Sequence, residues 1–234
     1  MNLRAPTPTA LLEVIVTSLE DALAAERGGA GRLEIVSHLD LGGLTPNFET
    51  LREICRCVAI PVRVMLRCSE SHTPRPSEVE FLAQQAEDLA ALGIDGLVLG
   101  FLWENQVDLA LTDRVLGRAP NLKATFHRAF DEAAYPLVEI GRLKELRQVD
   151  RILTSGGDGP WETKATRLGH YQQAAAPEIT ILAGGGLDRV GIERLLSETP
   201  IREFHTGRAV RFPDDPSGNV QTEKVRQLVA CLRQ

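Results

Sequence analysis

Short apolar runs alternate with longer amphipathic segments along the whole chain. The short runs have the length and composition of buried strands, and the longer segments repeat apolar residues at helical spacing. The predicted strands are residues 11–17, 33–37, 62–68, 96–102, 123–127, 151–154, 179–183 and 203–206. The predicted helices are residues 19–28, 48–58, 78–92, 109–118, 137–146, 161–175, 189–196 and 223–232.

Polar residues suited to capping mark the starts of several of these helices. Asn47 and Asp188 have side chains that can accept a hydrogen bond from the first helical turn. Ser77, with Glu80 three residues later, has the pattern of a capping box. We therefore expect helices to begin directly after Asn47, Ser77 and Asp188.

The eight strand–helix units predict an α/β fold, a closed (β/α)8 TIM barrel that forms a single domain over residues 11–234. Strands joined by helical crossovers form a parallel sheet, and eight units in 234 residues suit a closed barrel. An open, doubly wound sheet is the alternative, but no G-x-G-x-x-G motif follows the first strand. Residues 1–10 carry two prolines and no apolar core, so we expect a disordered N-terminal tail rather than a signal peptide.

Charge and composition exclude some classes of partner. The net charge is −6 and the pI is about 5.5, which does not favour nucleic acid or an anionic membrane as a partner. The chain has no run of about 18 apolar residues, so we expect no membrane span and a cytoplasmic protein. The 22 arginines outnumber the 4 lysines, which indicates guanidinium groups with specific, bidentate partners.

The four cysteines, Cys55, Cys57, Cys68 and Cys231, do not form the pattern of a disulfide framework. Cys55 and Cys57 lie in a predicted helix, where side chains two residues apart point about 200° away from each other. They cannot bind one metal ion unless that helix is broken. Cys68 lies near a strand end, and His72 in the following loop would have to fold over it. Cys68 and His72 are therefore weak candidates for a metal site.

A base, a guanidinium and a carboxylate gather within five residues at the end of the fifth predicted strand. His127, Arg128 and Asp131 could together bind an anion, move a proton or hold a metal ion. Alternatively, Arg128 and Asp131 pair with each other and brace a loop, while His127 is a core residue. All strand ends of a barrel face one mouth, where the active sites of this fold lie. Similar groups on other strands therefore favour the functional alternative.

Glu13 and Glu34 lie within predicted strands between apolar neighbours, where an unpaired carboxylate is costly. Arg67, at the end of the third strand, is one candidate partner for them. The alternative is a structural ion pair at the base of the barrel. The candidate catalytic residues are Glu13, Glu34, Arg67, His127, Arg128 and Asp131.

Hydroxyl groups and glycines follow the last three predicted strands. Such glycines let backbone N–H groups approach a ligand, and the ends of the last two strands are the common phosphate site of this fold. Arg208 lies beside them, although the glycines could also serve only to make tight turns. The predicted anion site consists of Thr154, Ser155, Gly184, Gly185, Gly186, His205, Thr206 and Gly207.

Several motifs occur in a fixed order between residues 11 and 209. GGLTP at residues 42–46 and TFHRAFD at residues 125–131 are the most specific, and RLE at 32–34, RILTSG at 151–156 and AGGG at 183–186 accompany them. Together they resemble the CutC family, described as copper homeostasis proteins. The resemblance implies a TIM barrel that is cytoplasmic and oligomeric. This chain departs from the family after the third strand, where only Arg67 of an Arg-Pro-Arg-x-Gly-Asp-Phe-like loop is present, and after the last, where His205-Thr206-Gly207 replaces His-Ser-Ser.

Three functions follow as alternatives. The resemblance implies copper homeostasis and copper binding, although Cu(I) prefers soft ligands and the chain has four cysteines and two methionines without a well-placed pair. The residues favour an enzyme acting on a small anionic metabolite that bears phosphate or carboxylate, with His127 as acid or base and Arg67 and Arg128 as anion clamps. A sensor would use the same mouth without turnover. A homo-oligomer is a further expectation from the resemblance.

Overall fold

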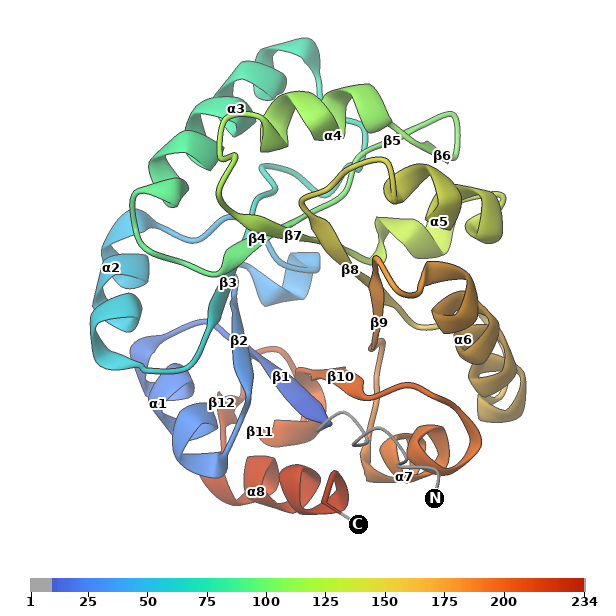
Figure 1. The fold of residues 1–234 in the computed structure, drawn as a ribbon. Helices are drawn as coiled ribbons and strands as arrows, with labels where there is room; N and C mark the ends of the chain where they lie inside the picture. The colour runs from blue at the N-terminus through green and yellow to red at the C-terminus, as the bar shows by residue number, and fades with distance from the viewer. Residues whose placement is uncertain (1–9, 234) are drawn as a thin grey trace, which may run out of the picture.

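The computed structural model describes residues 10–233, and its main strands close into an eight-stranded parallel barrel (Figure 1). The predicted (β/α)8 barrel is confirmed, and the predicted tail lies, apart from residue 10, outside the described residues. The barrel strands are β1 (Leu11–Val16), β2 (Arg32–Ile35), β3 (Val62–Met65), β4 (Gly96–Leu99), β7 (Lys123–Phe126), β8 (Val149–Thr154), β9 (Thr180–Ala183) and β10 (Glu203–Thr206). Their order around the barrel is β1-β10-β9-β8-β7-β4-β3-β2.

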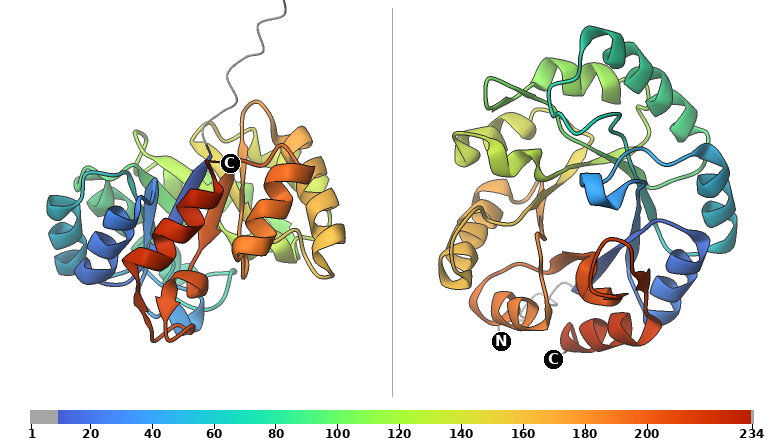
Figure 2. Two further views of the ribbon diagram at one scale, coloured as in Figure 1. Left: turned by 90° about the horizontal axis from the view of Figure 1, so that it is seen from below. Right: turned by 180° about the vertical axis from the view of Figure 1, so that it is seen from behind.

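Helices form the outer ring of the barrel, as both views in Figure 2 show. They pack apolar faces against the strands, around a core of aliphatic and aromatic side chains. Within residues 10–233, no helix is long and apolar enough to cross a bilayer. The helices are α1 (Leu19–Gly28), α2 (Phe48–Cys57), α3 (Pro76–Ala90), α4 (Leu109–Leu116), α5 (Pro136–Leu143), α6 (Trp161–Ala175), α7 (Arg189–Glu198) and α8 (Thr222–Cys231).

Two of the three predicted helix caps are confirmed. Asn47 accepts a hydrogen bond from the Thr50 backbone N–H at 2.8 Å, and Asp188 accepts one from Gly191 at 2.9 Å. The prediction for Ser77 is wrong, because α3 begins two residues earlier than predicted, at Pro76. Proline suits the first helical turn. A backbone N–H there has no partner within the helix, so proline loses no hydrogen bond by lacking one.

The predicted strand 96–102 ends early, at Leu99. The following residues form a small hairpin of β5 (Leu102–Trp103) and β6 (Gln106–Val107). Its two turn residues, Glu104 and Asn105, have φ values of 49° and 58°, as a tight hairpin turn between two antiparallel strands requires. A second hairpin, β11 (Arg211–Phe212) and β12 (Asn219–Val220), follows β10 and was also not predicted.

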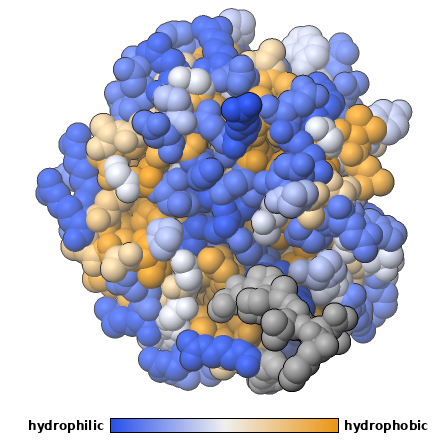
Figure 3. Space-filling model, viewed as in Figure 1, coloured by the Kyte–Doolittle hydropathy of each residue, from blue (hydrophilic) through white to orange (hydrophobic). Residues whose placement is uncertain are grey.

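Buried ion pairs occupy the base of the barrel, where the strands begin. Arg63 donates to Asp95 at 2.9 Å and to both carboxylate oxygens of Asp150 at 2.8 and 2.9 Å. Arg151 donates to both oxygens of Glu203 at 2.6 and 2.9 Å. Figure 3, viewed onto this end, shows hydrophilic residues over the centre of the barrel. The opposite end is therefore the one left for a ligand.

Three short 3-10 helices lie at the ends of barrel strands. They are η1 (Leu39–Leu41), η2 (Arg128–Glu132) and η3 (Arg208–Val210). Figure 2, right, views the barrel from the end that carries η1. Each of the three supplies side chains to the cavity described next.

Candidate functional site

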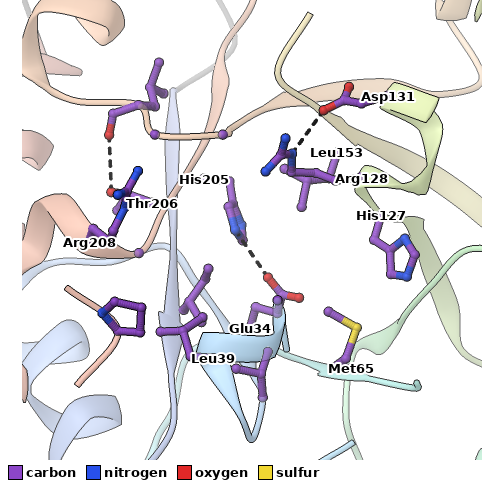
Figure 4. A pocket seen from close by; sticks show the side chains of 18 of the residues that line it. Glu34, Leu39, Met65, His127, Arg128, Asp131, Leu153, His205, Thr206 and Arg208 are labelled. Carbon is purple, nitrogen blue, oxygen red and sulfur yellow. Dashed lines mark hydrogen bonds and ion pairs between the residues drawn. The ribbon is translucent and has the colours of Figure 1, made fainter. Parts of the chain in front are cut away.

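A cavity of about 730 Å³ opens at the carboxyl ends of the barrel strands (Figure 4). It has charged residues at its rim and both charged and apolar residues deeper in. This is the place where active sites of the fold lie. Of the predicted site residues, those that line it are Glu34, Arg67, His72, His127, Arg128, Asp131, Gly185, Gly186, His205, Thr206 and Gly207.

Two glutamates and a histidine meet at the floor of the cavity. Glu13 on β1 and His205 on β10 are register partners, and His205 Nδ1 lies 2.8 Å from Glu13 Oε1. His205 Nε2 lies 3.4 Å from Glu34 Oε2. All three residues are buried, and only Glu34 and His205 line the cavity. Glu13 lies behind them and reaches the site through the imidazole.

The partner of Glu13 is Arg32, which sequence reasoning missed. Arg32 is the register partner of Glu13 on β2, and its Nε donates to Glu13 Oε2. Its Nη2 also donates to Glu203 Oε2 at 2.9 Å. The expectation that Arg67 pairs with the glutamates is wrong, because Arg67 follows the end of β3 and its guanidinium donates to the Glu70 backbone carbonyl. Glu13 thus forms the structural ion pair considered as the alternative, and Glu34 does not.

The surroundings shift the pKa values of the two glutamates in opposite directions. Burial tends to raise the pKa of Glu13, but Arg32 and His205 outweigh it and hold that pKa far below the usual value. Burial, reinforced by the charge of Glu13, raises the pKa of Glu34 to about 7 despite His205. Burial tends to lower the pKa of His205, but Glu34 and Glu13 raise it above 6.5. Glu34 is therefore a group at the floor that can gain and lose a proton near neutrality.

We expect Glu34→Gln to become more stable relative to the wild type by about 2 kcal/mol between pH 5 and pH 8. The Glu34 carboxyl ionises near pH 4.5 in the unfolded chain but only near pH 7 in the folded protein. Ionisation therefore costs the wild type stability as the pH rises through this window, and glutamine has no proton to lose. Urea unfolding at several pH values measures the difference. A constant or shrinking difference would contradict the protonation assigned to Glu34.

The two ring nitrogens of His127 have different surroundings. Its Nδ1 accepts a hydrogen bond from the Ala129 backbone N–H at 3.1 Å, whereas its Nε2 is buried without a hydrogen-bond partner among residues 10–233. Burial, together with His72 and Arg67, lowers the pKa of His127 well below 6.5. The ring is therefore neutral at pH 7. It is not the fully satisfied core histidine considered as the alternative.

Arg128 and Asp131 pair with each other and also line the cavity. Arg128 Nε donates to Asp131 Oδ2 at 3.0 Å. Asp131 accepts further hydrogen bonds from the Thr154 hydroxyl, the Ser155 backbone N–H at 3.2 Å and the Ser155 hydroxyl at 2.8 Å. Arg128 and Asp131 therefore both brace the loop and line the cavity. Thr154 and Ser155 hold Asp131 in place and do not line the cavity themselves.

The glycine turns differ in where they place their backbone. Gly185 and Gly186 have φ values of 80° and 82° and line the cavity, as Gly207 does. Gly184 does not line it, since a Cβ there would lie 2.7 Å from the Leu153 side chain. The position of a Cβ on Gly185 is 3.5 Å from Arg128 Cζ. Bare backbone and a guanidinium thus lie together at this wall of the cavity.

The weak metal candidates do not come together as a copper site. His72 lines the cavity and lies 3.2 Å from Glu132, whereas Cys68 packs against the apolar core and does not line the cavity. Met65 contributes the one thioether among the described lining residues. Glu13, Glu34 and His205 have ligand atoms within 4.8 Å of one another, but Arg32 and His205 occupy the Glu13 oxygens as donors. This donor set does not fit Cu(I), which needs two or three soft ligands.

A model of the CutC family matches residues 10–210. The chain belongs to the CutC family. A CutC family protein of Xanthomonas axonopodis pv. citri is 35% identical over 95% of this chain and 99% of its own length. The mouse copper homeostasis protein cutC homolog is 35% identical over 83% of this chain and 72% of its own length. A CutC structure from Streptococcus agalactiae has a TM-score of 0.79 at 25% identity, covering 85% of this chain and 98% of that one.

The two most specific CutC motifs both build the cavity. In the motif at residues 125–131, His127, Arg128 and Asp131 line it directly. In the motif at residues 42–46, Gly42 lines it, and Thr45 exchanges hydrogen bonds of 2.9 to 3.1 Å with the Arg67 backbone. The second motif therefore fixes the segment that places Arg67 at the rim.

Proposed function

We propose that this chain contributes to copper homeostasis, as the descriptions of its relatives say of them, by binding a small anionic metabolite in the cavity. The observation that carries the binding part is that Arg67, Arg128 and Arg208 line one cavity. A guanidinium binds carboxylate or phosphate through parallel N–H donors. The ligand class is therefore a metabolite that bears a phosphate or a carboxylate.

The size and the walls of the cavity support this ligand class. A volume of about 730 Å³ suits a small metabolite. The Gly185–Gly186 turn lies against the Arg128 guanidinium at the end of β9, where this fold commonly binds phosphate. An anion placed there meets positive charge and an exposed backbone. The body of the ligand then extends toward Glu34 and His127.

The same proposal includes residence in the cytoplasm and assembly into a homo-oligomer, as the resemblance implies, and no nucleic-acid or membrane partner. Direct copper binding is the competing form of the copper role. It would need ligands that the cavity does not bring together, because Met65 is there and Cys68 is not. We therefore propose that the chain acts in copper homeostasis through the metabolite that it binds, and not through a tight Cu(I) site.

A thermal-shift screen of phosphorylated and carboxylate metabolites tests the proposal. A ligand at 100 times its Kd stabilises a protein by about 2.7 kcal/mol, so we expect a rise in Tm of about 5–10 °C for the right anion. A parallel arm adds Cu(I) to the wild type and to Cys68→Ser. No response to any anion, with a stoichiometric Cu(I) response that disappears in Cys68→Ser, would refute the proposal.

A further inference from the structure

Three buried polar atoms of residues that line the cavity have no hydrogen-bond partner among the described residues. They are Glu34 Oε1, His127 Nε2 and Arg67 Nε, and the first two carry the inference that follows. Glu34 is 2% exposed and His127 is 4% exposed, so bulk water hardly reaches either residue. A buried polar atom without a partner is costly, and both residues line the same cavity. We infer that polar groups of a bound ligand form hydrogen bonds with these atoms.

Each of the two side chains has a polar contact at its other atom. His205 lies beside Glu34 Oε2 at 3.4 Å, which leaves Oε1 as the free oxygen (Figure 4). The Ala129 N–H donates to His127 Nδ1, so Nδ1 carries no proton and the ring proton of the neutral imidazole is on Nε2. Glu34 therefore offers a proton acceptor to the cavity, and His127 offers a proton donor.

The barrel places these two groups on different walls of the cavity. Glu34 lies on β2 and His127 directly follows β7, and β3 and β4 lie between those strands. Three strand spacings amount to about 14 Å along the wall, and both side chains reach inward from it. A small substrate between them would meet a base on one side and a hydrogen-bond donor on the other.

We propose that the cavity is an active site for proton abstraction from the carbon next to a carbonyl group, with Glu34 as the base and His127 as the donor to the carbonyl oxygen. This inference rests on the proposed function, because the substrate is a member of the same class: a small ketone or keto acid that carries a phosphate or carboxylate. Arg128 and Arg208 hold the anionic end. His205 and Glu13 are positioning residues for Glu34.

The step conserves atoms and electrons without a cofactor. Glu34 Oε1 takes the proton from the carbon, and the electron pair of that bond forms the carbon–carbon double bond of an enolate. The carbonyl π pair moves to the oxygen, which His127 Nε2–H stabilises by a hydrogen bond. A neutral imidazole can polarise a carbonyl in this way. Return of a proton from Glu34 to the carbon regenerates the ketone, with a solvent proton in place of the original one.

The test follows deuterium incorporation from D2O by proton NMR, with dihydroxyacetone phosphate and pyruvate as probes and calorimetry for binding. We expect the wild type to accelerate exchange of the protons next to the carbonyl, and Glu34→Gln to lose at least 100-fold of that rate while binding the probe within about threefold. Glu178→Gln, an exposed carboxylate paired with Lys144, is the matched control and keeps the wild-type rate.

The outcomes separate this inference from the proposed function. Binding of a probe without exchange overturns the proposed proton transfer but leaves the proposed anion binding unaffected. If neither probe binds, the substrate class named in this inference is wrong. A second measurement needs no Glu34 variant. Nitrogen-15 NMR of labelled histidine, assigned with His127→Gln, should show a neutral ring protonated at Nε2 from pH 6 to pH 8. A cationic ring, or one protonated at Nδ1, overturns the role of His127.

Discussion

Replacing Arg32 by alanine is expected to lower the free energy of unfolding by about 3–5 kcal/mol at pH 7. Arg32 is 2% exposed and donates to Glu13 and, at 2.9 Å, to Glu203. Its removal leaves Glu13 buried with His205 as its remaining counter-charge. A buried carboxylate that loses its partner keeps the full cost of leaving water, so the loss should far exceed that of an exposed ion pair.

Arg226→Ala provides the control for this effect. Arg226 pairs with Glu223 on the outside of α8, and both side chains are exposed. Such pairs contribute about 0–1 kcal/mol. Urea unfolding of the wild type and both variants measures the contrast. Losses for the two variants that agree within about 1 kcal/mol would contradict the role assigned to Arg32.

The barrel could be predicted because its signals are local and repeated. Short apolar runs and amphipathic helices alternate eight times, and Asn47 and Asp188 cap helices through contacts three residues away. The hairpin at Leu102–Val107 was not predictable from the same signals, because the apolar run GLVLGFL continues through Gly100 without a polar break. Only the positive φ values at Glu104 and Asn105 mark the turn.

Strand ends were a reliable guide to the cavity because a barrel brings them to one face. His127 and Arg128 follow β7, Arg67 follows β3 and His205 lies on β10, and all four line it. The partner of Glu13 was missed because pairing depends on register, and a slip of one residue exchanges the inner and outer faces of a strand. Arg32 alternates with Glu34 across Leu33, and this pattern was the available signal that both point inward.

Register and loop geometry also decide which residues line the cavity and which only support the lining residues. Thr154 and Ser155 follow the same kind of strand as His205, yet they bind Asp131 and do not line the cavity. The three consecutive glycines separate in the same way, with Gly184 packed against Leu153 and the next two facing the cavity. Sequence spacing cannot distinguish these neighbours.

Arg128→Ala is expected to weaken binding of the cavity anion by about 10- to 100-fold, because a hydrogen bond to a charged group contributes about 1.5–3 kcal/mol. The Arg128 side chain is 54% exposed, so its loss should change stability little. Asp131 keeps its hydrogen bonds from Thr154 and Ser155. The fold and the cavity wall therefore persist while the anion loses its donor.

Titration calorimetry of the strongest anion against the wild type, Arg128→Ala and Arg189→Ala tests the central claim most directly. Arg189 is 65% exposed and pairs with Glu193 on α7, which matches Arg128 in exposure and in its carboxylate partner but lies outside the cavity lining. We expect wild-type affinity for Arg189→Ala and a loss of about 10- to 100-fold for Arg128→Ala. Equal affinities for all three proteins, or tight Cu(I) binding that persists in Arg128→Ala and disappears in Cys68→Ser, would contradict it.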